Sequence, residues 1–283
     1  MWIKKKEIEQ LSEFVKGYSS GEELDIRVNK EGSFNILKND IYALVNTKNE
    51  QIKAVEAERD SLSDYMADIS HQMKTPLTSI SLLLNLLQEE HLSEKKRLQY
   101  VQDLMKLTGR IDWMVYALLR LAKLDAGTVQ LQQIPYRIED LIKAAVTPLE
   151  IALDIRDITL EVQIQPDLQH RGDISWMTEA VSNILKNCME HTPSGGHIHI
   201  VTKDNPLYLL IKITDSGSGF TKQDLPHIFE RFYRGQNADT DSVGIGLALA
   251  KRIIIAQNGT IRAYNHKKDG GAVFEIRMYK GAV

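Results

Sequence analysis

One histidine and two glycine motifs are the parts of this chain best suited to chemistry. His71 stands within ISHQMKTP at positions 69–76, and glycine motifs follow as DSGSG at 215–219 and GIG at 244–246. An imidazole can act as a nucleophile, and glycines let a backbone approach a base or a phosphate closely. A nucleophile combined with a nucleotide pocket predicts a phosphotransfer enzyme.

The residues around His71 follow a helical pattern. From Lys48 to Leu87 apolar side chains recur every three or four residues, as in a long amphipathic helix. His71 is two residues from the nearest members of that stripe on either side, so at about 100° per residue its imidazole faces outward. Thr75 lies on the same face as His71, and Pro76 is expected to bend the helix there.

A second amphipathic stripe, from Leu98 to Ala122, follows Ser93, a candidate N-cap, and Gly127 ends this region. The two helices predict a hairpin. A lone hairpin cannot bury both stripes, whereas two copies can do so as a four-helix bundle. We therefore expect a homodimer.

After Gly127 the pattern changes to alternating strands and helices. The strands are expected at 128–134, 158–164, 197–202, 207–215, 260–265 and 272–278, and the helices at 138–153, 175–191 and 243–257. The expected fold class is α+β multidomain, with a dimeric four-helix bundle followed by an α/β sandwich. The expected domains are an N-terminal juxtamembrane or signal-transmitting segment at 1–47, containing short charged helices and a strand near 24–28, the hairpin at 48–126 and the α/β domain at 127–283.

Composition narrows the partners and the compartment. The net charge of -3 gives no general basic field, so we expect no nucleic acid partner. The single Cys188 has no partner for a disulfide or a cysteine metal site, which fits a reducing compartment, and we expect it to pack within a helix. No stretch approaches the ~18 consecutive apolar residues of a membrane helix.

The expected location is therefore cytoplasmic for the chain as given. Its start, MWIKKK at 1–6, resembles the cytoplasmic flank of a membrane helix, although a solvated helix start explains it equally well. We expect membrane contact only if a transmembrane sensor precedes the chain, which would make it the cytosolic part of an inner (plasma) membrane sensor.

The motifs of the α/β region suit a nucleotide. Asp215 ends an apolar strand, where its carboxylate can accept from an adenine amino group while the following glycines let the backbone approach the base. The motif at 244–246 opens a helix, whose N-terminus attracts phosphate. Either motif alone can also be an ordinary turn.

Polar residues on the helix at 175–191 recur every four residues along the edge of its apolar stripe, at Asn183, Asn187 and His191. These amides and the imidazole can hold hydrated Mg²⁺ and phosphate oxygens, although an exposed polar face explains them too. The connection at 229–241 is expected to form a lid. Within it, Arg231 and Arg234 are candidates to reach the terminal phosphates, and one of them can instead be a surface ion-pair residue.

In this order the motifs resemble the sensor histidine kinases of bacterial two-component systems. The similarity runs from about Ala57 to Tyr279 and covers five blocks: the phosphoacceptor block at 69–76, the asparagine block at 183–191, the first glycine block at 215–219, the phenylalanine block at 229–234 and the second glycine block at 244–249. It implies a Bergerat-type ATP-binding α/β sandwich, shared with gyrase-like ATPases, attached to a dimeric four-helix bundle.

The resemblance implies roles for single residues. His71 would be phosphorylated from ATP, Asn187 would be the Mg²⁺ contact, and Asp215 would read adenine. The phosphoryl group would pass to an aspartate on the receiver domain of a response regulator, and Thr75 would orient water when the enzyme dephosphorylates that regulator. The nucleotide would also meet Asn183, His191, Gly217, Gly219, Arg231, Arg234, Gly244, Gly246 and Leu247.

Gln72 departs from the pattern of the family, in which many members carry an acidic residue directly after the phosphoacceptor histidine. The amide cannot take a proton, but its carbonyl can hold the Nδ1–H of His71, so we expect reduced assistance. Two alternatives stay open: a gyrase-like ATPase whose helical arm is only a dimerisation clamp, and a scaffold that binds the regulator without phosphorylating His71.

Overall fold

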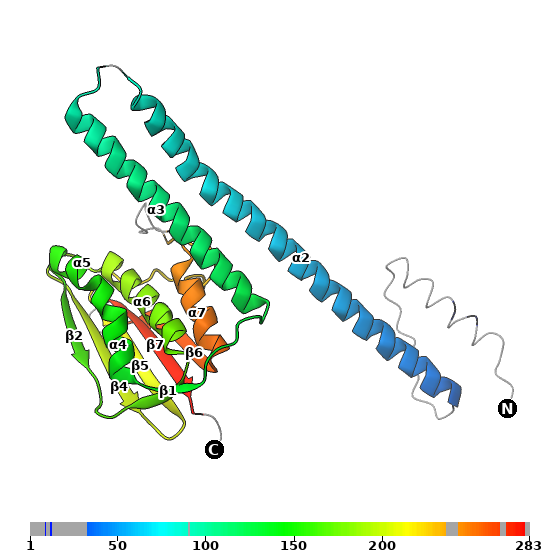
Figure 1. The fold of residues 1–283 in the computed structure, drawn as a ribbon. Helices are drawn as coiled ribbons and strands as arrows, with labels where there is room; N and C mark the ends of the chain where they lie inside the picture. The colour runs from blue at the N-terminus through cyan, green and yellow to red at the C-terminus, as the bar shows by residue number, and fades with distance from the viewer. Residues whose placement is uncertain are drawn as a thin grey trace. The chain divides into compact units, whose positions relative to one another are not determined.

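A computed structural model of the chain describes residues 33–89, 91–235, 243–266 and 270–280, together with Glu9 and Ser12 (Figure 1). The chain divides into two compact units, Met1–His71 and Gln72–Val283. The strand expected near 24–28 and the lid positions 236–241 lie outside the described residues. None of the described helices is long and apolar enough to cross a membrane.

Two long helices open the described chain. Helix α2 spans Ser33–Leu86 and α3 spans Glu94–Asp125. The start of α2 lies well before the expected Lys48, because no glycine or proline between Ser33 and Thr47 interrupts the helix. The N-cap prediction for α3 is confirmed, since Ser93 Oγ accepts from Lys96 N at 3.4 Å.

Five shorter helical segments belong to the α/β domain. They are α4 (Ile138–Val146), the 3-10 turn η1 (Thr147–Leu149), α5 (Glu150–Ile155), α6 (Ile174–His191) and α7 (Gly246–Ala256). The prediction of one helix over 138–153 was wrong, because Pro148 lacks an N–H and cannot donate to the carbonyl oxygen of Ala144 four residues earlier. The chain therefore leaves α4, passes through η1 and starts α5.

The strands form two sheets. The larger has the order β2-β4-β5-β7-β6, in which β2 and β4 are parallel and the other neighbours are antiparallel. The smaller pairs β1 with β3. The strands are β1 (Ile134–Arg137), β2 (Thr159–Gln163), β3 (Gln169–Gly172), β4 (His197–Asp204), β5 (Tyr208–Asp215), β6 (Gly259–Asn265) and β7 (Ala272–Tyr279).

The strand expected at 128–134 was wrong, because the chain there has no partner strand. Ile134 pairs with Gly172, and the next residue after Gly172 is Asp173, which caps α6 instead of continuing β3. The ladder therefore begins only at Ile134. Strand β3 was not expected, since its four residues, QHRG, show no apolar alternation.

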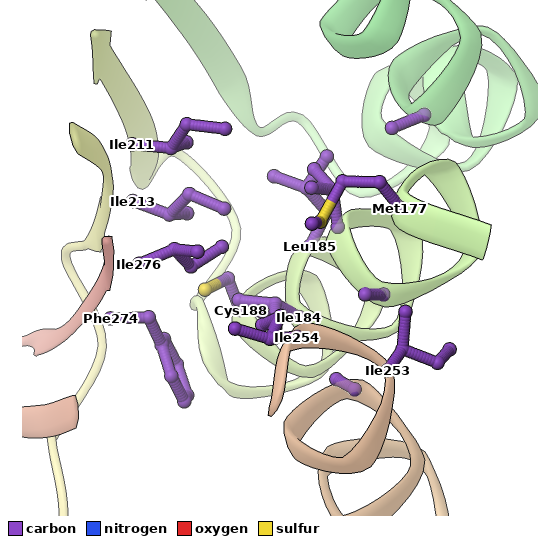
Figure 2. Close-up of a cluster of buried hydrophobic side chains, with 14 of the residues drawn as sticks. Met177, Ile184, Leu185, Cys188, Ile211, Ile213, Ile253, Ile254, Phe274 and Ile276 are labelled. Atoms are coloured by element: carbon purple, nitrogen blue, oxygen red, sulfur yellow. The ribbon is translucent and has the colours of Figure 1, made fainter. Parts of the chain in front are cut away.

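The core lies between one face of the larger sheet and the helices α4, α6 and α7, which Figure 1 shows on the same side of it. Side chains of β5, β7, α6 and α7 meet there, as Figure 2 shows for Ile211, Ile213, Phe274, Ile276, Met177, Ile184, Leu185, Cys188, Ile253 and Ile254. The packing role expected for Cys188 is confirmed, because its side chain is fully buried.

The start of α6 is fixed by a buried polar pair. The Asp173 carboxylate accepts from Ser175 N at 3.1 Å and Trp176 N at 3.2 Å, and its second oxygen accepts from Gln132 N at 3.2 Å. Gln257, at the end of α7, holds the Asp173 backbone by accepting from its N–H at 2.7 Å and donating to its carbonyl at 3.2 Å. These bonds tie two core helices together.

Asp173→Ala is therefore expected to lower the free energy of unfolding of the α/β domain by about 1–2 kcal/mol, since it removes an N-cap and leaves partly buried N–H groups without their acceptor. Asp154→Ala, on the exposed side of α5, should change it by less than about 0.5 kcal/mol. Urea unfolding followed by tryptophan fluorescence measures both values. Equal losses in the two variants would contradict the capping role.

Candidate functional site

A cavity of about 460 Å³ lies within the second compact unit. Its walls come from α3, α6, the end of β5, the segment 218–235 and the start of α7. Most of the residues predicted from sequence to meet nucleotide lie on its wall, namely Asn183, Asn187, His191, Asp215, Gly219, Arg234, Gly244, Gly246 and Leu247. Four blocks distant in sequence thus form one cavity.

Asp215 reaches the cavity from the core face of β5. Burial alternates along this strand, so Asp215 follows Ile211 and Ile213 on the buried side, and its exposure is only 3%. Its Oδ1 accepts from Gly217 N at 2.9 Å and from Ala272 N at 3.0 Å. These bonds fix the carboxyl group while its second oxygen keeps acceptor capacity. Burial, and then the charge of Asp215, raise the pKa of the Cys188 thiol behind it.

Three of the predicted glycines are required by close backbone contacts. Gly219 has φ +69°, and a Cβ there would lie 2.3 Å from the carbonyl oxygen of Gly270. A Cβ on Gly217 would lie 2.4 Å from the carbonyl oxygen of His191, so this glycine lets its loop pass the end of α6. Gly217 itself is not among the residues that line the cavity. Gly244 has φ +75°, and a Cβ there would lie 2.6 Å from the carbonyl oxygen of Tyr233. This glycine therefore lets residues 232–233 of the lid segment lie directly against the chain that leads into α7.

The polar rim of α6 runs beside the N-terminus of α7. A Cβ on Gly246 would lie 3.3 Å from Asn183 Oδ1, so the amide and the first backbone N–H groups of α7 adjoin one another. Such groups suit phosphate oxygens. Among the described residues no three His, Cys, Asp or Glu side chains gather to hold a metal. The Asn183 and Asn187 amide oxygens instead fit Mg²⁺, which takes a few protein oxygens and completes its shell with water and phosphate.

The segment leading to the lid is held by Asp224, which sequence reasoning missed. Asp224 Oδ1 accepts from the hydroxyl of Tyr233 at 2.7 Å, and Oδ2 accepts from the hydroxyl of Thr221 at 2.8 Å. The bond to Asp224 raises the pKa of Tyr233. Because Arg234 follows Tyr233 directly, this bond positions the arginine on the cavity wall.

The two predicted arginines separate. Arg234 lines the cavity, whereas Arg231 forms an ion pair with Asp125 at the end of α3 and is not on the cavity wall. Arg252 of α7 pairs with the same carboxylate. The ion pair of Arg231 fits the alternative given above, in which one of the two arginines is a surface ion-pair residue.

Helix α3 contributes a wall that sequence reasoning also missed. Lys106, Leu107, Gly109, Arg110 and Trp113 line the cavity. Positions 106, 110 and 113 recur every three or four residues, but on a different side of the helix from the apolar stripe between Leu98 and Ala122 on which the sequence prediction was based.

His71, Gln72 and Thr75 lie on α2. His71 and Thr75 are exposed, as expected for an outward face, and Gln72 is partly exposed. Pro76 is buried inside the helix and has no N–H, so it cannot donate to the carbonyl oxygen of Gln72 four residues earlier. The backbone beside His71 is therefore depleted of one helical hydrogen bond.

Two family models match the chain. Residues 61–127 match the His Kinase A (phospho-acceptor) domain, and residues 172–281 match the histidine kinase-, DNA gyrase B- and HSP90-like ATPase. The first range contains His71, and the second contains the cavity residues of α6, β5 and α7. The expectation of a helical region followed by an ATP-binding α/β domain is thus confirmed.

Curated relatives include the sensor protein SphS of Synechococcus elongatus, which is 31% identical over 81% of this chain and 59% of that protein. The heme sensor protein HssS of Staphylococcus saprophyticus is 28% identical over 78% of this chain and 47% of its own length. The chain therefore spans about half the length of the curated relatives that it matches.

Solved structures share the fold. The Acinetobacter baumannii histidine kinase AdeS aligns with a TM-score of 0.61 at 19% identity, covering 75% of this chain and 98% of that one. The histidine kinase ThkA, solved in complex with the response regulator protein TrrA, aligns with a TM-score of 0.65 at 18% identity over 82% of this chain and 66% of that one. With a phospho-acceptor domain followed by this ATPase domain, and with sensor proteins among its relatives, the chain belongs to the two-component sensor histidine kinases.

Proposed function

We propose that this chain is an ATP-dependent protein histidine kinase that phosphorylates His71 and transfers the phosphoryl group to an aspartate on a response regulator. The observation that carries the proposal is the cavity in which Asp215, the asparagine rim of α6 and the N-terminus of α7 meet. Dephosphorylation of the same regulator, with Thr75 orienting water, is part of the proposal. It is supported by the exposure of Thr75 near His71 on α2.

ATP would bind with its adenine at Asp215. The carboxylate is buried and fixed by two backbone donors, so it can accept from the exocyclic amino group without rearranging. The phosphates would lie toward the backbone N–H groups of α7 near Gly244, Gly246 and Leu247, and toward Arg234. Asn187, with Asn183 and His191 beside it, would hold Mg²⁺, which offsets the charge of the phosphates.

The transfer step needs a neutral imidazole. Nε2 of His71 would attack the γ-phosphorus, a new N–P bond would form, and the bond between that phosphorus and the bridging oxygen of ADP would break. The Nδ1 proton is the one to be held or removed. Gln72 follows His71 and offers an amide oxygen that can hold this proton in place but cannot accept it.

The assembly and location are also proposals. The apolar stripes of both helices are exposed in a single chain, for example at Leu77, Leu84, Leu98 and Met105, and a second copy would cover them in a four-helix bundle. The boundaries 1–47, 48–126 and 127–283 stay predictions. We propose attachment to a membrane sensor as well, supported by the sensor proteins among the relatives and by their greater length.

His71→Ala is expected to abolish phosphoprotein formation. The parent incubated with γ-labelled ATP and Mg²⁺ should gain an acid-labile, alkali-stable label, because a phosphoramidate hydrolyses in acid. His91→Ala, which removes another exposed histidine after the end of α2, should label like the parent. Steady ATP turnover with no labelled protein would favour a gyrase-like ATPase, and nucleotide binding with neither would favour a scaffold.

Asp215→Asn should weaken ATP binding by about 30- to 100-fold while the domain stays folded. The amide oxygen can replace Oδ1 and accept from Gly217 N and Ala272 N, but the amide nitrogen then presents a donor to the adenine amino group. Displacement of a fluorescent ATP analogue measures the affinity, with Asp140→Asn on the exposed side of α4 as the control. Unchanged affinity in Asp215→Asn would refute this adenine site.

Gln72→Glu should raise the single-turnover rate of autophosphorylation by about tenfold, below the ~10²-fold that a fully positioned general base contributes. The carboxylate accepts the proton that the amide can only hold. Gln102→Glu on α3 adds the same charge on an exposed side chain and should leave the rate unchanged. An equal or lower rate in Gln72→Glu would show that assistance at this position does not limit transfer.

A further inference from the structure

Besides the exposed apolar stripe assigned to the bundle, helix α3 carries a second stripe, whose side chains change from apolar to polar along the helix. Met114, Ala117 and Leu121 are fully buried against the α/β domain, and Leu124 continues them. Toward the N-terminus the same interval of three or four residues leads to residues on the wall of the nucleotide cavity, which are Trp113, Arg110 and Lys106. The apolar half of the stripe docks the helix, and the polar half lies over the cavity.

Polar contacts fix the docked half. Arg120 Nη2 lies 3.3 Å from Glu179 Oε2 on α6, and the guanidinium stacks 3.8 Å from the centre of the Trp176 ring. Burial raises the pKa of Glu179, and the charge of Arg120 opposes this shift. At the end of α3, Asp125 pairs with Arg252 of α7. The helix is thus held at several points along its axis.

These contacts also set the register between α3 and α6. Arg120 meets Glu179, and seven residues earlier the Trp113 ring lies 5.3 Å from Lys186 Nζ, which is seven residues after Glu179. The helices therefore run antiparallel with matched rise, at about 1.5 Å per residue. Continued by one turn, this register brings Arg110 level with Glu190, and both residues line the cavity.

The described lining residues of the cavity carry four basic and three acidic side chains. The acids are Glu190, Asp215 and Asp224. Glu190 pairs with Lys186 at 3.9 Å, Asp224 accepts from two hydroxyl donors, and Asp215 accepts from backbone donors. The bases are Lys106, Arg110, Lys186 and Arg234. A nucleotide diphosphate or triphosphate adds several negative charges to such a wall, and a guanidinium fork can bind two phosphate oxygens at once.

We propose that Arg110, assisted by Lys106, binds the phosphate chain of the nucleotide held by the α/β domain, so that the phosphoacceptor hairpin supplies part of the nucleotide site. The inference rests on the proposed function, because it takes the cavity to hold ATP or ADP. Its consequence is reciprocal coupling: nucleotide strengthens the docking of α3, and docking of α3 strengthens nucleotide binding by the same factor.

The test compares ligands with and without phosphate on the full chain. Titration calorimetry with ADP·Mg²⁺ and with adenosine is carried out on the parent, Arg110→Ala and Arg110→Lys. Arg110→Ala should weaken ADP about tenfold and adenosine less than about twofold, since only ADP loses a charged hydrogen bond. Arg110→Lys should give an intermediate ADP affinity, because it keeps the charge and loses the fork.

Arg97→Ala is the matched control. It removes an exposed arginine from the same helix, about 220° around the axis from Arg110, and should leave both affinities unchanged. The proposal is overturned if Arg110→Ala binds ADP like the parent, or if ADP and adenosine weaken together, which would indicate lost packing. Asp215→Asn distinguishes a failure of this proposal from a failure of the proposed function. If it lowers neither the ADP nor the adenosine affinity, the assignment of the cavity to a nucleotide itself fails.

Discussion

The buried carboxylate of Asp215 is the constraint on which this edge of the α/β domain depends. A charged group that is only 3% exposed needs hydrogen bonds, and Asp215 obtains them from the backbone of Gly217 and Ala272. Those two bonds bring a loop and the start of β7 against the end of β5. A Cβ on Gly271 would lie 1.8 Å from the carbonyl oxygen of Asp215, so only glycine fits. The glycine at 271 thus follows from the close approach of β5 and β7 that these bonds to Asp215 require.

Helix α6 contributes both to the hydrophobic core and to the wall of the cavity. Its apolar stripe packs on the sheet, while Asn183, Asn187 and His191 recur every four residues on the adjoining edge and line the cavity. The rotation of α6 about its axis is set by the core, and its start is set by the Asp173 cap held by Gln257. The position of the amides is therefore a consequence of packing, which explains how a hydrophobic core can preorganise polar ligands.

Sequence predicted the elements whose signals are local and missed those that depend on a partner. Helix α6 and strand β5 carry their own periodicity, and the start of α7 carries its glycines, so all three were placed within a few residues. The alternation at 128–134 looked equally like a strand, but Asp173 caps a helix where a partner residue would have to be. The bond between Asp224 and Tyr233 joins residues nine apart through side chains, and no periodicity reports it.

Arg231 has two candidate partners, the Asp125 carboxylate with which it pairs in the structure and the phosphates of the nucleotide. Asp125 also pairs with Arg252, so it keeps a cationic partner if Arg231 leaves. The side chains of Asp125 and Arg231 are about one-third exposed, at 30% and 34%, and pairs of that kind contribute only ~0–1 kcal/mol. A phosphate in the cavity is a stronger acceptor than a shared carboxylate. The contact of Arg231 with phosphate stays a prediction.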